Sequence, residues 1–517
     1  MDHISPVSRQ QYEFVNLEDC INTDNPVRFV DAFVDKLDLH KLGFKIAKLN
    51  AEGRPSFKSG LFLKIYIYGY LNGIRSTRKL ERECVRNIEM QWLCGRLKPN
   101  YHSIADFRKV NPNALRNTFK LFVSFLREAD LVGGELIAID GTKSRAHNSK
   151  KNNYNQKKVD RHLKYLEDRS KEYLKELDRC DSEEKDSERI NGIQEKIKRL
   201  KEKEIKYHQI ASQLEESGEV QVSTTDADAR ALLVHGQVVE VSYNTQAAVD
   251  EKHKLVVATH TINRNDRNAF SAVVKETQEN LNKKTFIAIA DKGYNNGREI
   301  EIAIKAGVTT IVALQEIVNS NEKGTTPDYL VTKFEYNKQE DTYTCPAGQV
   351  LKSTGTWHTK KRSEEFSFKF KKYRTPACKN CPVKHLCTAR AEGREIERSE
   401  FAESTDLNAH NYTTQYDVYR KRQELNEHVF GTIKRVWGYY YTNLKGLKKV
   451  NGEMSLIMTV YNMKRTINIL GFDKLMDKLR VWKPKYKKSW ACKHFINAAG
   501  FIWTVLNPRM GFPCAHF

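Results

Sequence analysis

Two short apolar runs, each followed by an aspartate, constrain the fold of this chain more than any other feature. The run in LIAIDGT ends at Asp140, and the run in TFIAIAD ends at Asp291. Short continuous apolar runs of this kind are typical of buried strands, so each aspartate is expected at the tip of a strand. Between them, VEVSYNTQAAVD and KLVVATHTI follow each other closely and predict an antiparallel pair. VTTIVAL (308–314) predicts a fifth strand. The expected fold is α/β, with a mixed five-stranded sheet and flanking helices.

Carboxylates at the ends of neighbouring parallel strands can reach common divalent ions. Asp140 and Asp291 would supply hard oxygen ligands, which suit Mg²⁺ or Mn²⁺. Two such ions about 4 Å apart activate a water and stabilise the leaving oxygen in phosphoryl transfer. The alternative interpretation is that each aspartate only caps the turn after its strand.

A third acid is expected from the helical segment YRKRQELNEHVFGTIKRVWG, which offers Glu424 and Glu427. Arg420, Glu427 and Lys434 are spaced by seven residues, so a regular helix would place them on one face. A carboxylate flanked by cations suits a metal ligand next to a phosphodiester. The alternative is an ordinary surface helix with ion pairs.

The charge of the chain points to a polyanionic partner. Its 87 Lys and Arg exceed its 65 Asp and Glu by 22, and residues 418–517 alone hold 19 basic against five acidic residues. Such asymmetry is typical of nucleic-acid binding, although a solvated basic surface is the alternative. No window approaches the roughly 20 apolar residues that span a bilayer, and the start MDHISPVSRQQ lacks the apolar core of a signal peptide.

Changes of composition divide the chain into several parts. Residues 1–130 are expected to form a helical DNA-binding domain, and residues 131–470 a catalytic domain. Within the latter, 150–218 is rich in charges of both signs and predicts an inserted helical hairpin. A cysteine-containing insertion is expected at 316–410, and a basic C-terminal tail at 471–517.

Four cysteines in that insertion have the spacing of a metal site. C-P-A-G is followed by C-x2-C-x5-C, and two thiolates two residues apart can grip one tetrahedral ion. We expect structural zinc on Cys345, Cys378, Cys381 and Cys387, with His385 as a substitute ligand. Reduced cysteines without a metal are the alternative.

Four motifs in this order carry a family resemblance: IAIDGTK, SYNTQAAVD, IADKGY and NEHVFGTIK. The chain resembles the DDE transposases of bacterial insertion sequences, in the branch with a helical insertion after the first Asp and a cysteine-containing insertion before the Glu. The resemblance extends from DNPVRFVDAFVDKL to about Leu470. It implies an RNase H-like domain that holds Asp140, Asp291 and Glu427 around two Mg²⁺ ions, which would serve strand cleavage and strand transfer.

The resemblance also implies partners and a location. The N-terminal helices would bind the terminal inverted repeats of double-stranded DNA, a homodimer would pair two ends, and the protein would act in the bacterial cytoplasm, at the nucleoid, without a membrane. A catalytically inactive DNA-binding protein derived from such an element is one alternative. A ribonuclease H-type nuclease without strand transfer is another.

Related transposases often carry Y-x2-R-x3-E-x6-K around the catalytic glutamate. Anchored on Glu427, this chain keeps Lys434, which would hold a phosphate near the cleaved end. Gln423 and Arg420 then stand where Arg and Tyr belong, because Tyr419 and Arg422 lie one residue out of register.

Overall fold

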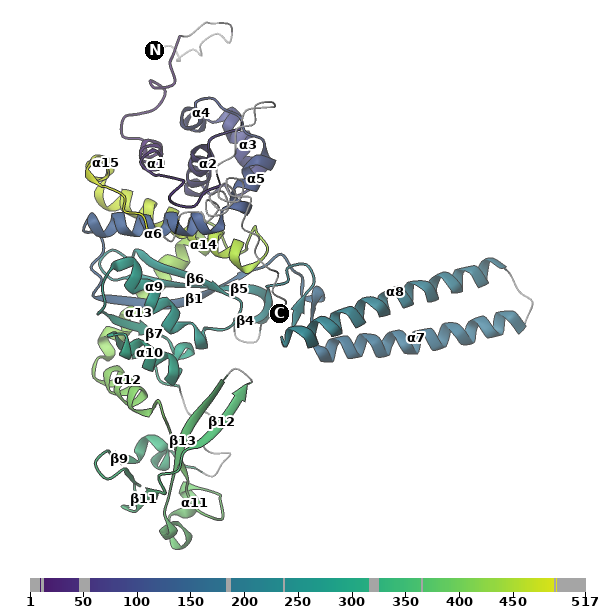
Figure 1. Cartoon of the computed structure of the whole chain (residues 1–517), viewed down its shortest axis with the longest axis vertical. Coiled ribbons are helices and arrows are strands. Elements are labelled where there is room, and N and C mark those ends of the chain that lie inside the picture. Colours follow the sequence, from purple (N-terminus) through teal and green to yellow (C-terminus); the bar gives the residue numbers. More distant parts are fainter. Residues whose placement is uncertain are drawn as a thin grey trace, which may run out of the picture.

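A six-stranded mixed sheet lies at the centre of the computed structural model of this protein (Figure 1). Its order is β4–β5–β1–β7–β8, and β6 pairs with the half of β5 that β4 leaves free. Its strands are β1 (Leu136–Arg145), β4 (Arg230–His235), β5 (Val238–Asp250), β6 (Val256–Ile262), β7 (Ile287–Ala290) and β8 (Thr309–Val312). β1 is antiparallel to β5 and parallel to β7, and β7 is parallel to β8. The predicted mixed sheet and the antiparallel β5–β6 pair are confirmed, and β4 is a strand beyond the five predicted.

The structure describes most of the chain. The described residues are 10, 14–45, 56–182, 187–235, 238–315, 325–363, 366–487 and 490.

The prediction that Asp140 ends its strand is wrong, because β1 continues to Arg145. Its first part pairs on both edges, with β5 and with β7, but the parallel ladder with β7 stops at Ile139. From Asp140 onward, β1 is held only by the antiparallel ladder with β5. Asp140 therefore marks the end of the parallel pairing and not the end of the strand.

Helices pack around the central sheet. They are α9 (Phe270–Leu281), α10 (Gly297–Lys305), α12 (Ala402–Thr414), α13 (Tyr416–Gly431), α14 (Leu447–Leu470) and α15 (Phe472–Val481). α9 connects β6 to β7 and packs on β5 and β6, while α13 packs across β1, β5 and β7. α14 is buried around most of its circumference, as expected for a helix with apolar residues on all sides. It lies between β6 and the N-terminal helices.

The N-terminal part is helical where the structure describes it. Its helices are α1 (Pro26–Asp35), α2 (Ser59–Leu71), α3 (Thr77–Arg86), α4 (Ile88–Cys94), α5 (Tyr101–Val110) and α6 (Pro112–Glu128). These helices and the sheet share one hydrophobic core that extends from Ile21 to Trp482. Trp482, beyond α15, packs against Phe33 and Phe125, so the first part of the segment predicted as a tail folds back onto the N-terminal helices.

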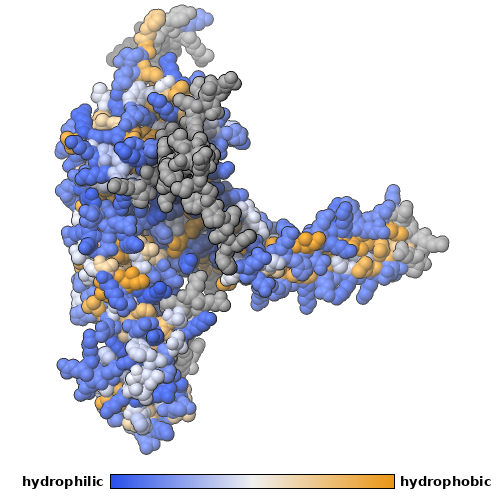
Figure 2. All heavy atoms as spheres, in the orientation of Figure 1, coloured by the Kyte–Doolittle hydropathy of each residue, from blue (hydrophilic) through white to orange (hydrophobic). Residues whose placement is uncertain are grey.

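The inserted hairpin projects away from the rest of the molecule (Figure 1). It consists of α7 (Gln156–Ser182) and α8 (Ser187–Ser217), and a small core around Tyr154, Val159 and Ile210 fixes its base. The base also contains the turn η1 (Lys150–Asn152) and the pair β2 (Asn153–Tyr154) and β3 (Val222–Ser223). Figure 2 shows its hydrophobic residues along the line where the two helices meet. The predicted helical hairpin is present.

The cysteine-containing insertion forms a second sheet with its own core. Its strands are β9 (Glu335–Asn337), β10 (Thr342–Thr344), β11 (Val350–Ser353), β12 (His358–Ser363), β13 (Phe366–Arg374) and β14 (Ile396–Ser399). Short helical turns accompany them: η5 (Pro327–Tyr329), η6 (Val331–Lys333), η7 (Pro376–Asn380) and α11 (Lys384–Cys387). Leu351, Tyr373 and Ile396 are buried at the centre of this unit.

Candidate active site

The two predicted aspartates meet at the carboxyl ends of β1 and β7. Ile139 pairs with Ala290 in the parallel ladder, so Asp140 and Asp291 are the next residues on neighbouring strands. One Asp291 oxygen accepts a hydrogen bond from the Gly293 amide at 2.8 Å, at the start of the turn η3 (Lys292–Tyr294). The cap that the alternative interpretation required is thus present at Asp291, but it occupies only one carboxylate oxygen.

Asp140 lies in a more enclosed setting. One of its oxygens accepts from the Gly141 amide at 2.7 Å, and the other accepts from the Arg422 guanidinium at 3.0 Å. Burial raises the pKa of Asp140 to about 6; the Arg422 charge opposes this rise, and the Asp291 charge adds to it. A bound cation would relieve this charge repulsion on Asp140.

A third carboxylate, Asp266, lies next to this pair and was missed by the sequence analysis. It opens the turn η2 (Asp266–Asn268) after β6, and its Oδ1 accepts from the side-chain amides of Asn244 and Gln246, each at 2.8 Å. Its Oδ2 accepts from the Lys143 ammonium at 3.2 Å. Burial alone would raise the pKa of Asp266, but these hydrogen bonds and the Lys143 charge hold it below the ordinary value.

The space above Gly141 is filled by these side chains. A methyl group at Gly141 would overlap with the Asp266 carboxylate and the Gln246 amide, and these side chains would have to move to accommodate it. The Oδ1 atom of Asn244 points into the same space, is fully buried and has no hydrogen-bond partner among the described residues. A carboxylate and an unpartnered amide oxygen therefore face the strand immediately after Asp140.

The predicted glutamate does not join this group in the structure. Glu427 is exposed, and its carboxylate accepts from the Gln423 amide at 2.9 Å. Glu424 forms an ion pair with Lys254 at 2.6 Å. Among the described contacts, none joins either glutamate to Asp140 or Asp291.

The contacts of Tyr419 and Arg422 show which face of α13 is turned toward Asp140, and Glu427 is not in register with that face. Arg422 pairs with Asp140, and the Tyr419 ring lies 5.9 Å from the Arg422 guanidinium. The side chain four residues after Arg422 is Asn426, which is buried and whose amide has no hydrogen-bond partner among the described residues. Glu427 lies one residue further, which is about 100° around a helix. The Tyr and Arg of the family spacing thus face the site, and the residue in register with them is Asn426.

Lys434 lies close to β1, but not on the face of Glu427. The regular helix ends at Gly431, and Lys434 falls in a π-helical turn, η8 (Thr432–Val436). This wider turn interrupts the regular helix that the seven-residue spacing of Arg420, Glu427 and Lys434 assumes. The Lys434 ammonium donates to the Lys143 carbonyl at 2.6 Å. Burial, aided by the Lys143 charge, lowers the pKa of Lys434 to about 8.

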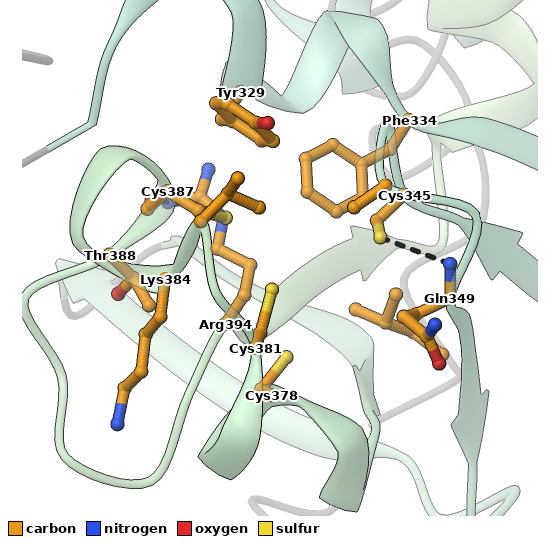
Figure 3. A pocket seen from close by; sticks show the side chains of 13 residues that line it. Tyr329, Phe334, Cys345, Gln349, Cys378, Cys381, Lys384, Cys387, Thr388 and Arg394 are labelled. Carbon is orange, nitrogen blue, oxygen red and sulfur yellow. Dashed lines mark hydrogen bonds between the residues drawn. The ribbon is translucent and has the colours of Figure 1, made fainter.

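The four cysteines of the insertion line one small hollow (Figure 3). Cys345 comes from the turn after β10, Cys378 and Cys381 from η7 and the residue after it, and Cys387 from α11. The Cys345 sulfur accepts a hydrogen bond from the Gln349 amide at 3.3 Å.

The described residues contain neither a preformed metal-binding group nor a helix that could span a membrane. Among them, no group of three or more His, Cys, Asp or Glu side chains converges closely enough to hold one ion. In the same part of the chain, every helix is too short or too polar to cross a membrane.

Comparisons with known proteins give two matches to family models. A model described as a transposase domain matches residues 15–110, and one described as a transposase DDE domain matches residues 344–467. The first match covers the helices α1–α5, and the second includes Glu427 and Lys434. No curated protein and no solved structure matches this chain.

Proposed function

This chain is a DDE transposase of the insertion-sequence type, and on that premise we propose that it cuts DNA at terminal inverted repeats and transfers the cut strand to a target. The observation that carries the proposal is the meeting of Asp140 and Asp291 at the ends of two parallel strands. Three antiparallel strands, β6, β5 and β1, followed by two parallel strands, β7 and β8, support an RNase H-like catalytic domain. The assay is metal-dependent nicking of a duplex that carries the repeat of the element.

The residues around Asp140 have the chemistry for a divalent ion such as Mg²⁺ or Mn²⁺. Asp140, Asp291 and Asp266 offer hard carboxylate oxygens, and the buried Asn244 oxygen lacks a partner. When bound, such ions activate the attacking hydroxyl and stabilise the leaving oxygen. The carboxylates do not converge on one point because Arg422 holds Asp140 and Lys143 holds Asp266. We propose that Arg422 and Lys143 turn toward the phosphates when DNA binds. Asp140 and Asp291 would then be free to hold two metal ions.

We assign the remaining roles to side chains near the same strand ends. Arg422, which pairs with Asp140 before DNA is bound, would turn to a DNA phosphate, and Lys434, held against β1 by the Lys143 carbonyl, would contact the phosphate next to the cut. Glu427 would be the third ligand. The match to the transposase DDE domain, which includes Glu427, supports this role.

Paired cutting requires two copies of the site on two DNA ends. We therefore propose a homodimer in the DNA complex, acting in the cytoplasm where the bacterial DNA lies. A catalytically inactive DNA-binding protein remains the second candidate. It predicts repeat binding without nicking in any divalent metal.

The choice of third carboxylate gives a direct prediction. Glu427→Gln should lose nicking and should not recover at high Mn²⁺, because an amide is a poor ligand for a hard ion. Asp266→Asn should only weaken nicking, and high Mn²⁺ should restore it. The Asp266 carboxylate already accepts three hydrogen bonds, so we expect it to contribute less than Glu427 to holding the ion. The rate of nicking is measured for both variants across an Mn²⁺ titration.

The matched control for this comparison is Glu424→Gln, one helical turn before Glu427, which should keep most activity. If Glu427→Gln is active and no Mn²⁺ concentration restores Asp266→Asn, the third carboxylate ligand is Asp266 and not Glu427.

We also propose that the cysteine hollow holds a structural zinc ion. Four thiols from three segments around one hollow support this. The thiols would have to close on the ion, because they do not form a ligand group as they stand.

Metal analysis tests the zinc proposal. The purified protein should contain about one zinc per chain, and Cys381→Ser should lower this content and the stability of the insertion, because metal binding there contributes folding energy. Cys180→Ser, in the hairpin, is the control and should leave the zinc content unchanged. Equal zinc in wild type and in a variant with all four cysteines replaced by serine would contradict the proposal.

A further inference from the structure

A groove rich in lysine lies where the N-terminal helices meet the catalytic part of the chain. It has a volume of about 540 Å³ and is lined by five lysines, which define the lysine groove: Lys45, Lys109, Lys445, Lys448 and Lys449. They come from three separate segments, namely the residues after α1, the end of α5, and the approach to and first turn of α14.

The lysine groove has an uncompensated positive charge. None of the five ammonium groups forms an ion pair within the described part of the chain, although ion pairs are frequent elsewhere in it. Asp228 is the single acidic residue that lines the groove, and its carboxylate accepts from the Leu447 amide at 2.7 Å. That acid therefore caps α14, and among the described residues it forms no ion pair with a lysine of the groove.

Two helix ends add to this field. The first turns of α6 and α14 both line the groove, and the amino ends of helices carry partial positive charge. The two helices approach so closely that a side chain at Gly452 would overlap with the Pro112 backbone. This close contact fixes the relative positions of the lysines on the two sides.

The groove continues along the N-terminal helices. A neighbouring hollow of about 440 Å³ shares Lys45, Val110 and Asn111 with it. This hollow adds Lys98, one acidic residue, Asp106, and polar side chains that include Asn100 and Ser103. Ammonium, amide and hydroxyl groups are the side chains that contact DNA phosphates and sugars without reading the sequence.

From these observations we infer that the lysine groove binds the phosphate backbone of double-stranded DNA and joins the repeat-binding helices to the catalytic part. The inference rests on the proposed function for the identity of the DNA. The inference goes beyond the proposed function because it assigns the affinity for the DNA backbone to a groove between the N-terminal helices and the catalytic part.

The test is a triple variant, Lys445→Ala/Lys448→Ala/Lys449→Ala, in the full-length protein. Affinity for repeat-containing and for unrelated duplexes of equal length is measured by fluorescence anisotropy from about 50 to about 200 mM salt. Both affinities should fall by at least about tenfold, and the slope of log affinity against log salt should decrease by roughly 2 to 3, about 1 for each lost phosphate contact. The matched control is Lys201→Ala/Lys203→Ala/Lys206→Ala on α8, which removes the same charge and should leave the slope unchanged.

Unchanged affinity and slope in the triple variant, or an equal loss in the α8 control, would overturn the inference. The single variant Lys448→Gln, with a slope change of about 1, covers the case in which the triple variant fails to fold. Nicking at saturating DNA separates the two proposals. A wild-type protein that binds through the groove but never cuts would contradict the proposed function and leave the inference about the groove standing.

Discussion

Asp291→Asn should abolish metal-dependent nicking of a terminal-repeat duplex, with a rate loss of at least about a thousandfold, or roughly 4 kcal/mol of barrier. The substitution keeps the size of the side chain and its hydrogen bond from the Gly293 amide, so the turn after β7 should stay intact. It removes the charge that, with Asp140, makes the strand ends attractive to a divalent ion. The rate is measured at matched protein concentration with excess Mg²⁺ and then with excess Mn²⁺.

The control for this variant is Asp477→Asn on α15, an exposed aspartate in an ion pair with Arg480. It should keep wild-type activity, and both variants should bind DNA as wild type does. Retention of more than about a tenth of the activity by Asp291→Asn would remove this residue from the catalytic group, because a tenfold loss is only about 1.4 kcal/mol.

Glu453→Ala should give the largest loss of stability of any single substitution considered, about 3 to 5 kcal/mol. Glu453 is fully buried in α14 and accepts from Arg75 at 2.8 Å, while Arg108 lies 3.6 Å away. It also accepts from the backbone amides of Asn443 and Leu444. Burial alone would raise the pKa of Glu453, but the two arginines together hold it below its ordinary value.

Loss of this carboxylate would leave two buried guanidinium groups without a counter-charge. Arg75 is also packed against the rings of Tyr439 and Tyr441, so the loss would reach the segment that pairs with the end of β1. The free energy of unfolding is measured by urea titration for Glu453→Ala and for Asp477→Asn, whose partner is exposed. A loss below about 1 kcal/mol would mean that the arginines find other partners or water.

The elements with strong local patterns could be predicted from the sequence. The continuous apolar runs before Asp140 and Asp291 identify β1 and β7, since buried parallel strands need no alternation. The balanced charges of the hairpin likewise identify α7 and α8. In each case the pattern is contained within about 30 residues.

The features that could not be predicted depend on pairing across long stretches of chain. β1 extends beyond the end of its pairing with β7 because it continues to pair with β5. The sequence of β1 alone does not reveal this pairing. Asp266 reaches Gly141 because β6 and β1 pair with opposite edges of β5, and no acidic motif marks it. The π-turn that contains Lys434 changes the direction in which the residues after α13 point, whereas helical spacing assumes a regular helix.

The central claim is that this chain cuts DNA with a site built on Asp140 and Asp291. The most direct test incubates wild-type protein with an end-labelled duplex that carries the terminal repeat, with Mg²⁺ or with a chelator, and maps the product by sequencing gel. The account predicts a nick at the repeat boundary that leaves a 3′-hydroxyl in Mg²⁺ and no product with the chelator. Protein that binds the duplex but produces no nick in Mg²⁺ or Mn²⁺, or that nicks equally with the chelator, would contradict it.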